Sequence, residues 1–412
     1  MFIYITISLV LFLVYVYIKI KYPFWSRQPV YHPYDYIRSL SSTPYIIHTQ
    51  LLPPITRYTS LPDITTIKFT DITADIMTKI IDLLLCNYIA SDKVIYTLSQ
   101  PALYGMMKAH DHPSMVSLYF TKEYIIDPSS NTQAFEVSPT PKYIGCITSA
   151  PIIFTFARPF SDGIQKIPVY YWDHICMNTK YTEKQLTPRL IQSHEFNQRS
   201  ETPEIKVSLF KKENSECPGV VPLCNYTSYT YYIRPFTPPH LPEHHIATQI
   251  TKENMDLLYD FIGGLTKTSA FEIQGFYCIG SMISQVVSKT LYIYMLCVGR
   301  EVYAVYIFKD AFTYYENLDN GNAVQLIASV NNCTSTELFY TGFLHSLRDL
   351  MNTKKNKKYE ILMIDTTSHS SIIHDYWRNT NSPIFTDANH YYLYNMYYPG
   401  MPISETKCLF IV

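Results

Sequence analysis

The sequence predicts an α/β protein of two tandem halves with mixed sheets, preceded by one N-terminal transmembrane helix. Three observations support this fold class. Residues 1–18 contain no charged side chain, and a polar, Pro-rich stretch at residues 197–245 divides the remaining chain. On each side of that stretch, helical and strand-like patterns alternate, which is typical of an α/β fold. We therefore predict an anchor at residues 1–20, a first half at 21–236 and a second half at 237–412.

The composition narrows the class of protein. With 412 residues, the chain is long enough for two domain-sized cores or one large double domain. Its net charge of -1 gives no reason to expect a nucleic-acid partner, because phosphate binding needs a basic surface. Tyr is abundant at 38 residues and Gly is scarce at 12. We interpret this bias as the codon usage of an AT-rich genome, such as that of a large DNA virus.

The sequence predicts neither a disulfide framework nor a metal site. Its nine cysteines are scattered and form no C-x-x-C pair, which favours free thiols in a reducing compartment. His240, His244 and His245 lie beside Glu243, but the surroundings are Pro-rich and no second cluster accompanies them. We interpret these histidines as loop residues rather than as zinc ligands, and we expect no bound cofactor.

The first segment is apolar on all sides and long enough to span a membrane. As a helix, residues 1–18 would measure roughly 27 Å, close to the thickness of a hydrocarbon core. A signal peptide would need a basic start and a small-residue cleavage site, and the segment has neither; a buried core helix is the remaining alternative. Lys19, Lys21 and Arg27 follow the apolar run. By the positive-inside tendency, we expect a single-pass membrane protein with residues 21–412 facing the cytosol.

The first half begins with a strap at residues 21–62, which is rich in Pro, Tyr and Ser and should contain little helix. Pro151 should break the strand in which it lies. The apolar face of the first long helix should consist of Ile76, Ile80, Ile81, Leu84 and Leu85. The predicted elements are helices at residues 73–88, 101–107 and 184–196 and strands at 115–119, 143–157 and 169–177.

The second half repeats this pattern. Gly299-Arg300 marks a turn between two strands. Thr334 and Glu337 have the spacing of a capping box at the start of a helix. The predicted elements are helices at residues 252–262 and 334–351 and strands at 291–298, 302–308, 359–365 and 391–397.

Four stretches of the chain match known motifs in order and spacing. They are Phe24-Trp25-Ser26-Arg27-Gln28-Pro29-Val30, residues 143–151, Ile175-Cys176 followed by Lys184 and Pro188, and residues 389–396. These stretches resemble the FWxTQPV, VGFISAIP, NFLCVHxKLRSKRLAP and YYLYNW motifs of the N-myristoyltransferase (glycylpeptide N-tetradecanoyltransferase) family, which has a duplicated GNAT fold. The resemblance covers roughly residues 22–412. It implies two GNAT-like halves, with acyl-CoA on the side of the first and a peptide on the side of the second.

The resemblance implies an acyltransferase that moves a fatty acyl group, myristoyl in the family, from acyl-CoA to the N-terminal glycine of a protein. Backbone N–H groups of His174 and Ile175 would stabilise the thioester oxyanion, and the terminal carboxylate of Val412 would be the base. Asp173 stands where the family has Asn. Acyl-CoA would contact Phe24, Trp25, Cys176, Met177, Glu183, Lys184, Gln185, Leu186 and Thr187, and the peptide would contact Asp365, Tyr391, Tyr392 and Tyr394.

The chain departs from the family where CoA phosphate should bind. The family's KLRSKR becomes residues 179–185, with two arginines lost and Glu183 added, so affinity for CoA should fall. The Asp173 carboxylate could act as a base or repel the oxyanion. Three functions stay open: an N-myristoyltransferase-like enzyme, an inactive relative that serves as a membrane or virion structural protein, and a GNAT-type enzyme with a shorter acyl donor. The expected partners are acyl-CoA, proteins with N-terminal Gly and a membrane, and we expect a monomer.

Overall fold

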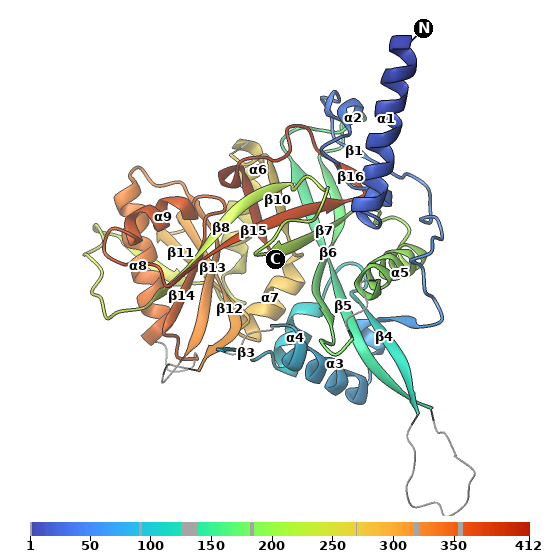
Figure 1. The fold of residues 1–412 in the computed structure, drawn as a ribbon. Helices are drawn as coiled ribbons and strands as arrows, with labels where there is room; N and C mark the ends of the chain where they lie inside the picture. The colour runs from blue at the N-terminus through green and yellow to red at the C-terminus, as the bar shows by residue number, and fades with distance from the viewer. Residues whose placement is uncertain are drawn as a thin grey trace, which may run out of the picture.

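The protein is described by a computed structural model that covers residues 2–89, 93–124, 139–181, 185–268, 270–316, 318, 321–352 and 357–412. Within these residues, helices pack around a 15-stranded sheet of mixed direction, and a separate two-stranded sheet joins the strap to a segment near the C-terminus. The predicted α/β fold class is therefore confirmed (Figure 1).

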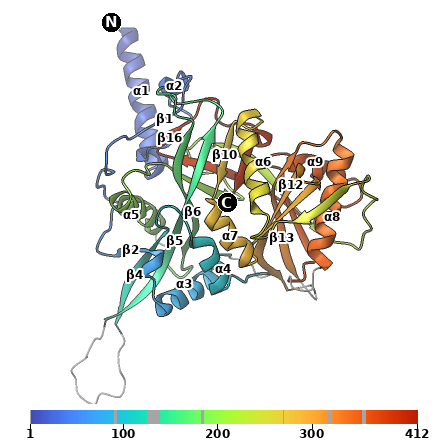
Figure 2. The same ribbon diagram turned by 180° about the vertical axis from the view of Figure 1, so that it is seen from behind.

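The helices are α1 (Phe2–Lys21), α2 (Tyr36–Ser39), α3 (Ala74–Asn87), α4 (Gln100–Met107), α5 (Leu186–Glu201), α6 (Met255–Thr268), α7 (Ile279–Val287), α8 (Thr336–Asn352) and α9 (Ser370–Trp377). Three short 3-10 helices lie at Trp25–Arg27, Phe69–Asp71 and Glu405–Lys407. Helices α3, α4 and α5 cover the part of the sheet from β4 (Met115–Tyr124) to β6 (Lys166–Met177), and α8 and α9 cover the part from β11 (Leu291–Val298) to β14 (Ile361–Asp365), as two views of the fold show (Figures 1 and 2).

The strands are β1 (Tyr45–Ile46), β2 (Ile64–Lys68), β3 (Val94–Tyr96), β4 (Met115–Tyr124), β5 (Pro139–Phe156), β6 (Lys166–Met177), β7 (Ser208–Glu213), β8 (Cys224–Tyr232), β9 (His245–Gln249), β10 (Ile273–Phe276), β11 (Leu291–Val298), β12 (Glu301–Tyr315), β13 (Asn322–Asn331), β14 (Ile361–Asp365), β15 (Phe385–Tyr394), β16 (Met396–Tyr397) and β17 (Cys408–Ile411). The main path of the sheet has the order β17-β10-β5-β6-β7-β15-β8-β14-β13-β12-β11-β9, and beside this path β4 pairs with β5 and β2, and β3 pairs with β12.

Strands from distant parts of the sequence are neighbours in this sheet. β15 lies between β7 and β8, and β17 pairs in parallel with β10, which in turn pairs with β5. Late strands therefore complete the sheet that early strands begin. The division of the chain at residues 236 and 237 stays a prediction.

β5 differs from the sequence prediction because Pro151 does not break it. On one side of β5, β6 pairs along both flanks of this residue. On the other side, pairing with β4 ends at Ser149 and pairing with β10 begins at Ile153. Pro151 falls in the gap between those two partners, where a missing N–H need not interrupt a ladder.

Two helix details also differ from the predictions. In α3, Leu85 is 38% exposed rather than inward-facing, while Met77 is buried, so the buried face is rotated toward Met77. At the start of α8, Ser335 rather than Thr334 is the cap, since its Oγ accepts from the Leu338 N–H at 3.1 Å. Thr73 caps α3 in the same way, accepting from the N–H of Ile76.

Helix α1 projects from the body of the molecule (Figure 1). Every side chain from Tyr4 to Tyr15 is exposed. Among the described residues, α1 is the one helix long and apolar enough to cross a membrane, with a mean hydropathy of 1.8 over Tyr4–Lys21. At its base, Lys19 Nζ donates to the carbonyl of Ser26 at 2.5 Å, and the Ser26 N–H donates to the carbonyl of Tyr22. These bonds fix the direction in which α1 leaves the body.

Candidate functional site

Two parallel strands, β6 and β7, separate and open a cavity. Their last paired residues are Trp172 and Phe210, yet β6 continues to Met177 and β7 to Glu213. The cavity has a volume of about 670 Å³. From the separated ends, the residues in its wall are Asp173, His174, Ile175, Lys211, Lys212 and Glu213. Parting strands leave backbone groups and side chains facing a space that no neighbouring strand fills.

The wall of this cavity contains a β-bulge. The register between β5 and β6 shifts by one residue, so that His174 and Ile175 together face Ile147. His174 has a φ of 50°, in the left-handed region that residues other than Gly adopt rarely. Such bulges bend a strand and redirect its backbone, and they occur often beside active sites. The bulge falls on the two residues that the sequence predicted as oxyanion donors.

The His174 side chain holds the bulge in place. Thr148 Oγ1 lies 3.1 Å from the carbonyl of Asp173 and 2.9 Å from His174 Nδ1. Its one hydrogen goes to the carbonyl, so it must accept from the protonated Nδ1. His174 Nε2 is then the acceptor for the hydroxyl of Tyr96 at 3.1 Å. Both ring nitrogens are therefore satisfied by protein groups, and the buried ring serves the structure of the bulge.

The backbone N–H of His174 already has a partner. It donates to Oδ1 of Asp173, the preceding residue, at 2.8 Å, and the Tyr88 hydroxyl donates to the same oxygen at 3.3 Å. The Asp173 carboxylate thus occupies one of the two N–H groups predicted to stabilise an oxyanion. Ile175, the other predicted donor, also lines the cavity.

Burial would raise the pKa of Asp173, but a charge on His174, the charge of Lys309 and the His174 N–H all act to lower that pKa. Burial is also the main influence on His174 and lowers its pKa, so we assign a neutral ring. The lysine and the backbone N–H therefore supply the stabilisation that keeps Asp173 ionised.

Two lysines and a glutamate lie at the base of the cavity. Lys211 Nζ lies 2.6 Å from Oε1 of Glu213. Burial lowers the pKa of Lys309, whereas for Lys211 the charge of Glu213 overcomes burial and raises the pKa well above its usual range. Lys309 Nζ also donates to the main-chain oxygen of Val412 at 3.1 Å. Val412 is 6% exposed and lines the cavity.

A second polar cluster continues the cavity wall across β15, β8, β14 and β13. Ser228 donates to Asp365, and Gln325 Nε2 lies 2.9 Å from both carboxylate oxygens of Asp365. Because the hydroxyl hydrogen of Ser228 points to Asp365, its oxygen accepts from Asn389 Nδ2 at 2.6 Å. Burial raises the pKa of Asp365 to about 6. This cluster offers hydrogen-bond acceptors and one titratable carboxyl to a ligand.

The opposite end of the cavity is apolar. Trp25 stacks on Phe210, with ring centroids 5.7 Å apart and an interplanar angle of 11°, and Phe24 packs edge-on against Trp25. Thr187, from the first turn of α5, lines this end together with Pro188 and Ile191. The cavity therefore combines an apolar end, a helix N-terminus and a charged base.

The structure brings only part of the predicted site together. Cys176 and Leu186 are buried in the core, and Met177 and Gln185 do not line the cavity. Glu183 and Lys184 lie outside the described residues. The predicted residues that line the cavity are Phe24, Trp25, Asp173, His174, Ile175, Thr187, Asp365, Tyr391 and Val412.

Tyr392 and Tyr394, which the sequence predicts at the peptide, do not line the cavity. Alternate residues of a strand point to opposite faces, and Tyr391 takes the cavity side. Tyr392 accepts from the Cys217 N–H at 2.8 Å, and Tyr394 Oη lies 2.6 Å from Glu195 Oε2. Both rings are fully buried in the core beside α5.

Sequence reasoning missed most of the charged residues in the cavity. Lys211 and Glu213 follow a short apolar run that did not read as a strand, and Lys309 comes directly after the predicted strand at 302–308. Asn389 lies in the motif at residues 389–396, but the sequence analysis assigns it no role in the site. These residues could have been found as charged side chains inside or next to an apolar strand, because a buried charge needs an oppositely charged or hydrogen-bonding partner.

Comparison with known proteins identifies the fold. A scan against models of protein families finds no match, and a search of curated proteins finds none. The structure is similar to that of Saccharomyces cerevisiae N-myristoyltransferase with bound myristoyl-CoA, with a TM-score of 0.65, 14% identity and coverage of 93% of this chain and 94% of that chain. A structure of the same yeast enzyme with myristoyl-CoA and inhibitors gives a TM-score of 0.65 and 13% identity, with coverage of 93% of this chain and 91% of that chain. The N-myristoyltransferase-like fold expected from the motifs is confirmed.

Proposed function

We propose that the protein is a membrane-anchored acyltransferase that moves a fatty acyl group from acyl-CoA to the N-terminal glycine of a protein. The observation that carries this proposal is the cavity between β6 and β7, with a bulge at His174 and Ile175 in its wall. Its three regions correspond to the three parts of the reaction: an acyl chain, a thioester and an amine. The likeness to a yeast enzyme that binds myristoyl-CoA supports this assignment.

The acyl-CoA would lie along the apolar end of the cavity. Phe24 and Trp25 would contact the acyl chain, and the N-terminus of α5, at Thr187, would face the CoA phosphates, as helix N-termini favour anions. The Ile175 N–H would stabilise the oxyanion. Asp365 and Tyr391 would border the acceptor peptide.

The chemistry would proceed at the charged base of the cavity. The Val412 carboxylate would take a proton from the glycine ammonium, and the free amine would attack the thioester carbonyl carbon. A C–N bond forms, the C–S bond breaks, and the CoA thiolate leaves with the second amine proton. Lys309, which donates to Val412, would hold the base in position.

The anchor would place this site at a membrane. We propose that α1 spans a bilayer as the anchor predicted at residues 1–20, and that residues 21–236 and 237–412 form the acyl-CoA side and the peptide side in the cytosol. Phe24 and Trp25 follow α1 by only a few residues. The acyl end of the cavity would therefore lie close to the bilayer, where a lipidated product would be released.

One observation favours a second function. The His174 N–H is bound by the Asp173 carboxylate, which both occupies a donor and places a negative charge beside the oxyanion. A protein with this arrangement could bind acyl-CoA or an acylated peptide without catalysing transfer, as a membrane or virion structural protein.

A transfer assay separates the two functions. The full chain in detergent would be incubated with labelled myristoyl-CoA and a peptide that begins with Gly, and a matched peptide that begins with Ala would be the control. The proposal predicts acyl-peptide with the Gly peptide alone. Tight binding of myristoyl-CoA without acyl-peptide at high enzyme concentration would support the second function instead.

Appending residues after Val412 should abolish turnover if its carboxylate is the base.

A further inference from the structure

An apolar patch, formed by Tyr36, Ile37 and Leu40, protrudes from the strap. These side chains belong to α2 and the residue after it, and they are 76%, 87% and 83% exposed. Outside α1, no other large hydrophobic side chain in the described parts of the chain is as exposed. In both ribbon views, α2 lies at the end of the molecule from which α1 projects (Figures 1 and 2).

The patch is held outward by polar contacts at its base. Arg38, within α2, points back to the strap, where its Nη1 donates to Oδ2 of Asp35 at 2.8 Å and to the carbonyl of Val30 at 3.2 Å. Val30 itself is fully buried. With the charged face of α2 tied to the body, the apolar side chains are left without protein contact on the outer side.

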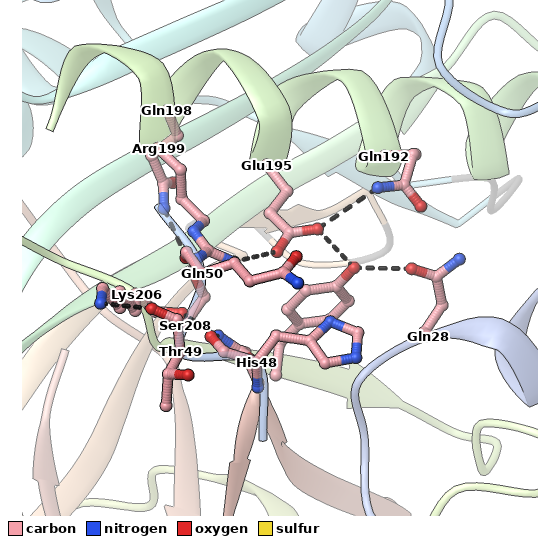
Figure 3. Close-up of polar contacts among 12 residues, drawn as sticks. Gln28, His48, Thr49, Gln50, Gln192, Glu195, Gln198, Arg199, Lys206 and Ser208 are labelled. Carbon is pink, nitrogen blue, oxygen red and sulfur yellow. Dashed lines mark hydrogen bonds and ion pairs between the residues drawn. The ribbon is translucent and has the colours of Figure 1, made fainter. Parts of the chain in front are cut away.

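The strap that carries α2 is fastened to the body by a buried polar network (Figure 3). Tyr394 Oη lies 2.6 Å from both Gln28 Oε1 and Glu195 Oε2. Arg199 donates to the carbonyl of Gln50 and lies 3.5 Å from Oε1 of Glu195. Because this network attaches the strap on both sides of α2, the patch has a fixed position relative to the cavity and to α1.

The charges of this region differ from those of the rest of the chain. Residues 1–62 contain one acidic residue, Asp35, whereas the whole protein is nearly neutral at a net charge of -1. The basic residues of this region are Lys19, Lys21, Arg27, Arg38 and Arg57. A basic region next to a membrane-spanning helix is attracted to anionic lipids of the cytosolic leaflet.

We propose that the strap is a second membrane contact, in which the apolar patch enters the boundary between headgroups and hydrocarbon of the bilayer that α1 spans. This inference rests on the proposed anchor. A lipid surface fits the patch better than another protein does, because the patch adjoins a helix that itself needs lipid, and because its basic surroundings match anionic headgroups. A second copy of the chain would bring the same positive charges together.

The contact would fix the orientation of the catalytic body. A single spanning helix leaves the body free to turn about the helix axis. A second contact, attached rigidly through the strap, stops that rotation and keeps the apolar end of the cavity facing the same part of the bilayer surface.

Lipid quenching of an added tryptophan tests this directly. The full chain carrying Ile37→Trp or Leu40→Trp would be reconstituted into phosphatidylcholine vesicles with phosphatidylserine, with or without bromine on the acyl chains. Val287→Trp, at a position 66% exposed on α7, is the matched control. We expect brominated lipid to remove the emission added at positions 37 and 40 but not that added at 287, with vesicle flotation confirming membrane binding.

Three outcomes would overturn the proposal. If the protein floats with vesicles but the added emission at 37 and 40 resists bromine, the patch does not enter the bilayer. If that emission is also shielded from aqueous acrylamide and the chains crosslink to one another, a second copy covers the patch. If the protein does not float, neither contact exists. Because quenching needs no turnover, a failure here is distinct from an absence of acyl transfer.

Discussion

Lys211 and Lys309 line the same cavity, but their surroundings shift their pKa values in opposite directions. Lys211 has a carboxylate 2.6 Å away, which raises its pKa, whereas burial lowers the pKa of Lys309. Groups in one site whose environments push their pKa values apart are suited to different roles. Lys211 pairs with Glu213, while Lys309 donates to Val412 and its pKa is raised by the charge of Asp173.

Replacing Lys309 by Met should therefore impair transfer more than folding. The change removes the donor to Val412 and the cation that helps to keep Asp173 ionised. We expect a fall in the single-turnover rate of acyl transfer of roughly a hundredfold, with acyl-CoA affinity nearly unchanged. Lys166→Met, at the exposed far end of β6, is the control. A Lys309→Met protein with the wild-type rate would remove this residue from the mechanism.

Glu195 should make the stability of the fold depend on pH. Burial raises the pKa of Glu195 from 4.5 to about 7. The position of Tyr394, whose single hydroxyl hydrogen faces two acceptors, also fits a carboxyl that carries a proton. Since the folded state binds this proton more tightly than the unfolded state, its contribution is complete below pH 4.5 and is lost as the pH rises through about 7.

The Glu195→Gln variant mimics the protonated acid and should not show this loss. Between about pH 5 and pH 8, the free energy of unfolding of the wild type should fall relative to the variant by up to about 3 kcal/mol. Chemical denaturation of both proteins in detergent measures the difference. A constant difference across this range, or a wild type that gains stability with pH, would show that Arg199 keeps Glu195 ionised.

At the scale of elements, the bulge of β6 determines what faces the cavity. An uninterrupted strand would keep the backbone of residues 174 and 175 paired with β5, whereas the bulge places both opposite Ile147. The conformation of His174 is uncommon, so it must be imposed by its surroundings. Thr148, 1% exposed on β5, provides that restraint through hydrogen bonds to the backbone and ring that flank the bulge.

Thr148→Val should consequently loosen the bulge. The variant keeps the shape of the side chain but leaves the His174 Nδ1–H and the Asp173 carbonyl without this partner. We expect a loss of about 1–3 kcal/mol in the free energy of unfolding and a slower transfer step. Thr148→Ser, which retains the hydroxyl, should behave like the wild type in both measurements. Equal stability of the Val and Ser variants would mean that other contacts hold the bulge.

The sequence predicts the type of the elements with long apolar patterns, but it does not predict β7 and β8, which lie in the polar stretch at residues 197–245, or the faces and partners of the strands. The helix around residues 74–87 is predicted because its apolar periodicity is local, and the helix around residues 100–107 because Pro101 favours the first turn of a helix. Tyr392 and Tyr394 were placed at the peptide, because a motif does not state which face of a strand turns inward. Lys211 and Lys309 are 98 positions apart by their numbers in the sequence, and only the strand order brings them to one cavity.

At the scale of the whole molecule, the apolar helix α1, the strap at residues 21–62 and the cavity are connected to one another. The strap continues directly from α1, contributes Phe24 and Trp25 to the cavity wall, and is fastened to α5 and β15 by the Glu195 network. In the proposed function, the strap at residues 21–62 would therefore serve both the acyl site and the attachment to a membrane.

Removing the aromatic ring of Trp25 from the strap should weaken acyl-CoA binding. Trp25→Ala removes the ring that stacks on Phe210, and burying less apolar surface should lower the affinity for myristoyl-CoA roughly tenfold or more. Trp25→Phe, which keeps an aromatic face, should lose less. Equilibrium titration gives both constants, and the affinity for CoA without an acyl chain serves as the control that should not change. An equal loss for CoA and myristoyl-CoA would place Trp25 away from the acyl chain.

The location of acyl-CoA tests the account most directly. A myristoyl-CoA analogue with a photoreactive diazirine in its acyl chain would be crosslinked to the full chain in detergent, and the labelled peptides would be identified by mass spectrometry. The account predicts label at residues 24–25 and 173–175 and at Thr187, Pro188 and Ile191, which line the cavity, and loss of that label when excess myristoyl-CoA is present. Label confined to α1, or label at the cavity that excess myristoyl-CoA does not displace, would contradict it.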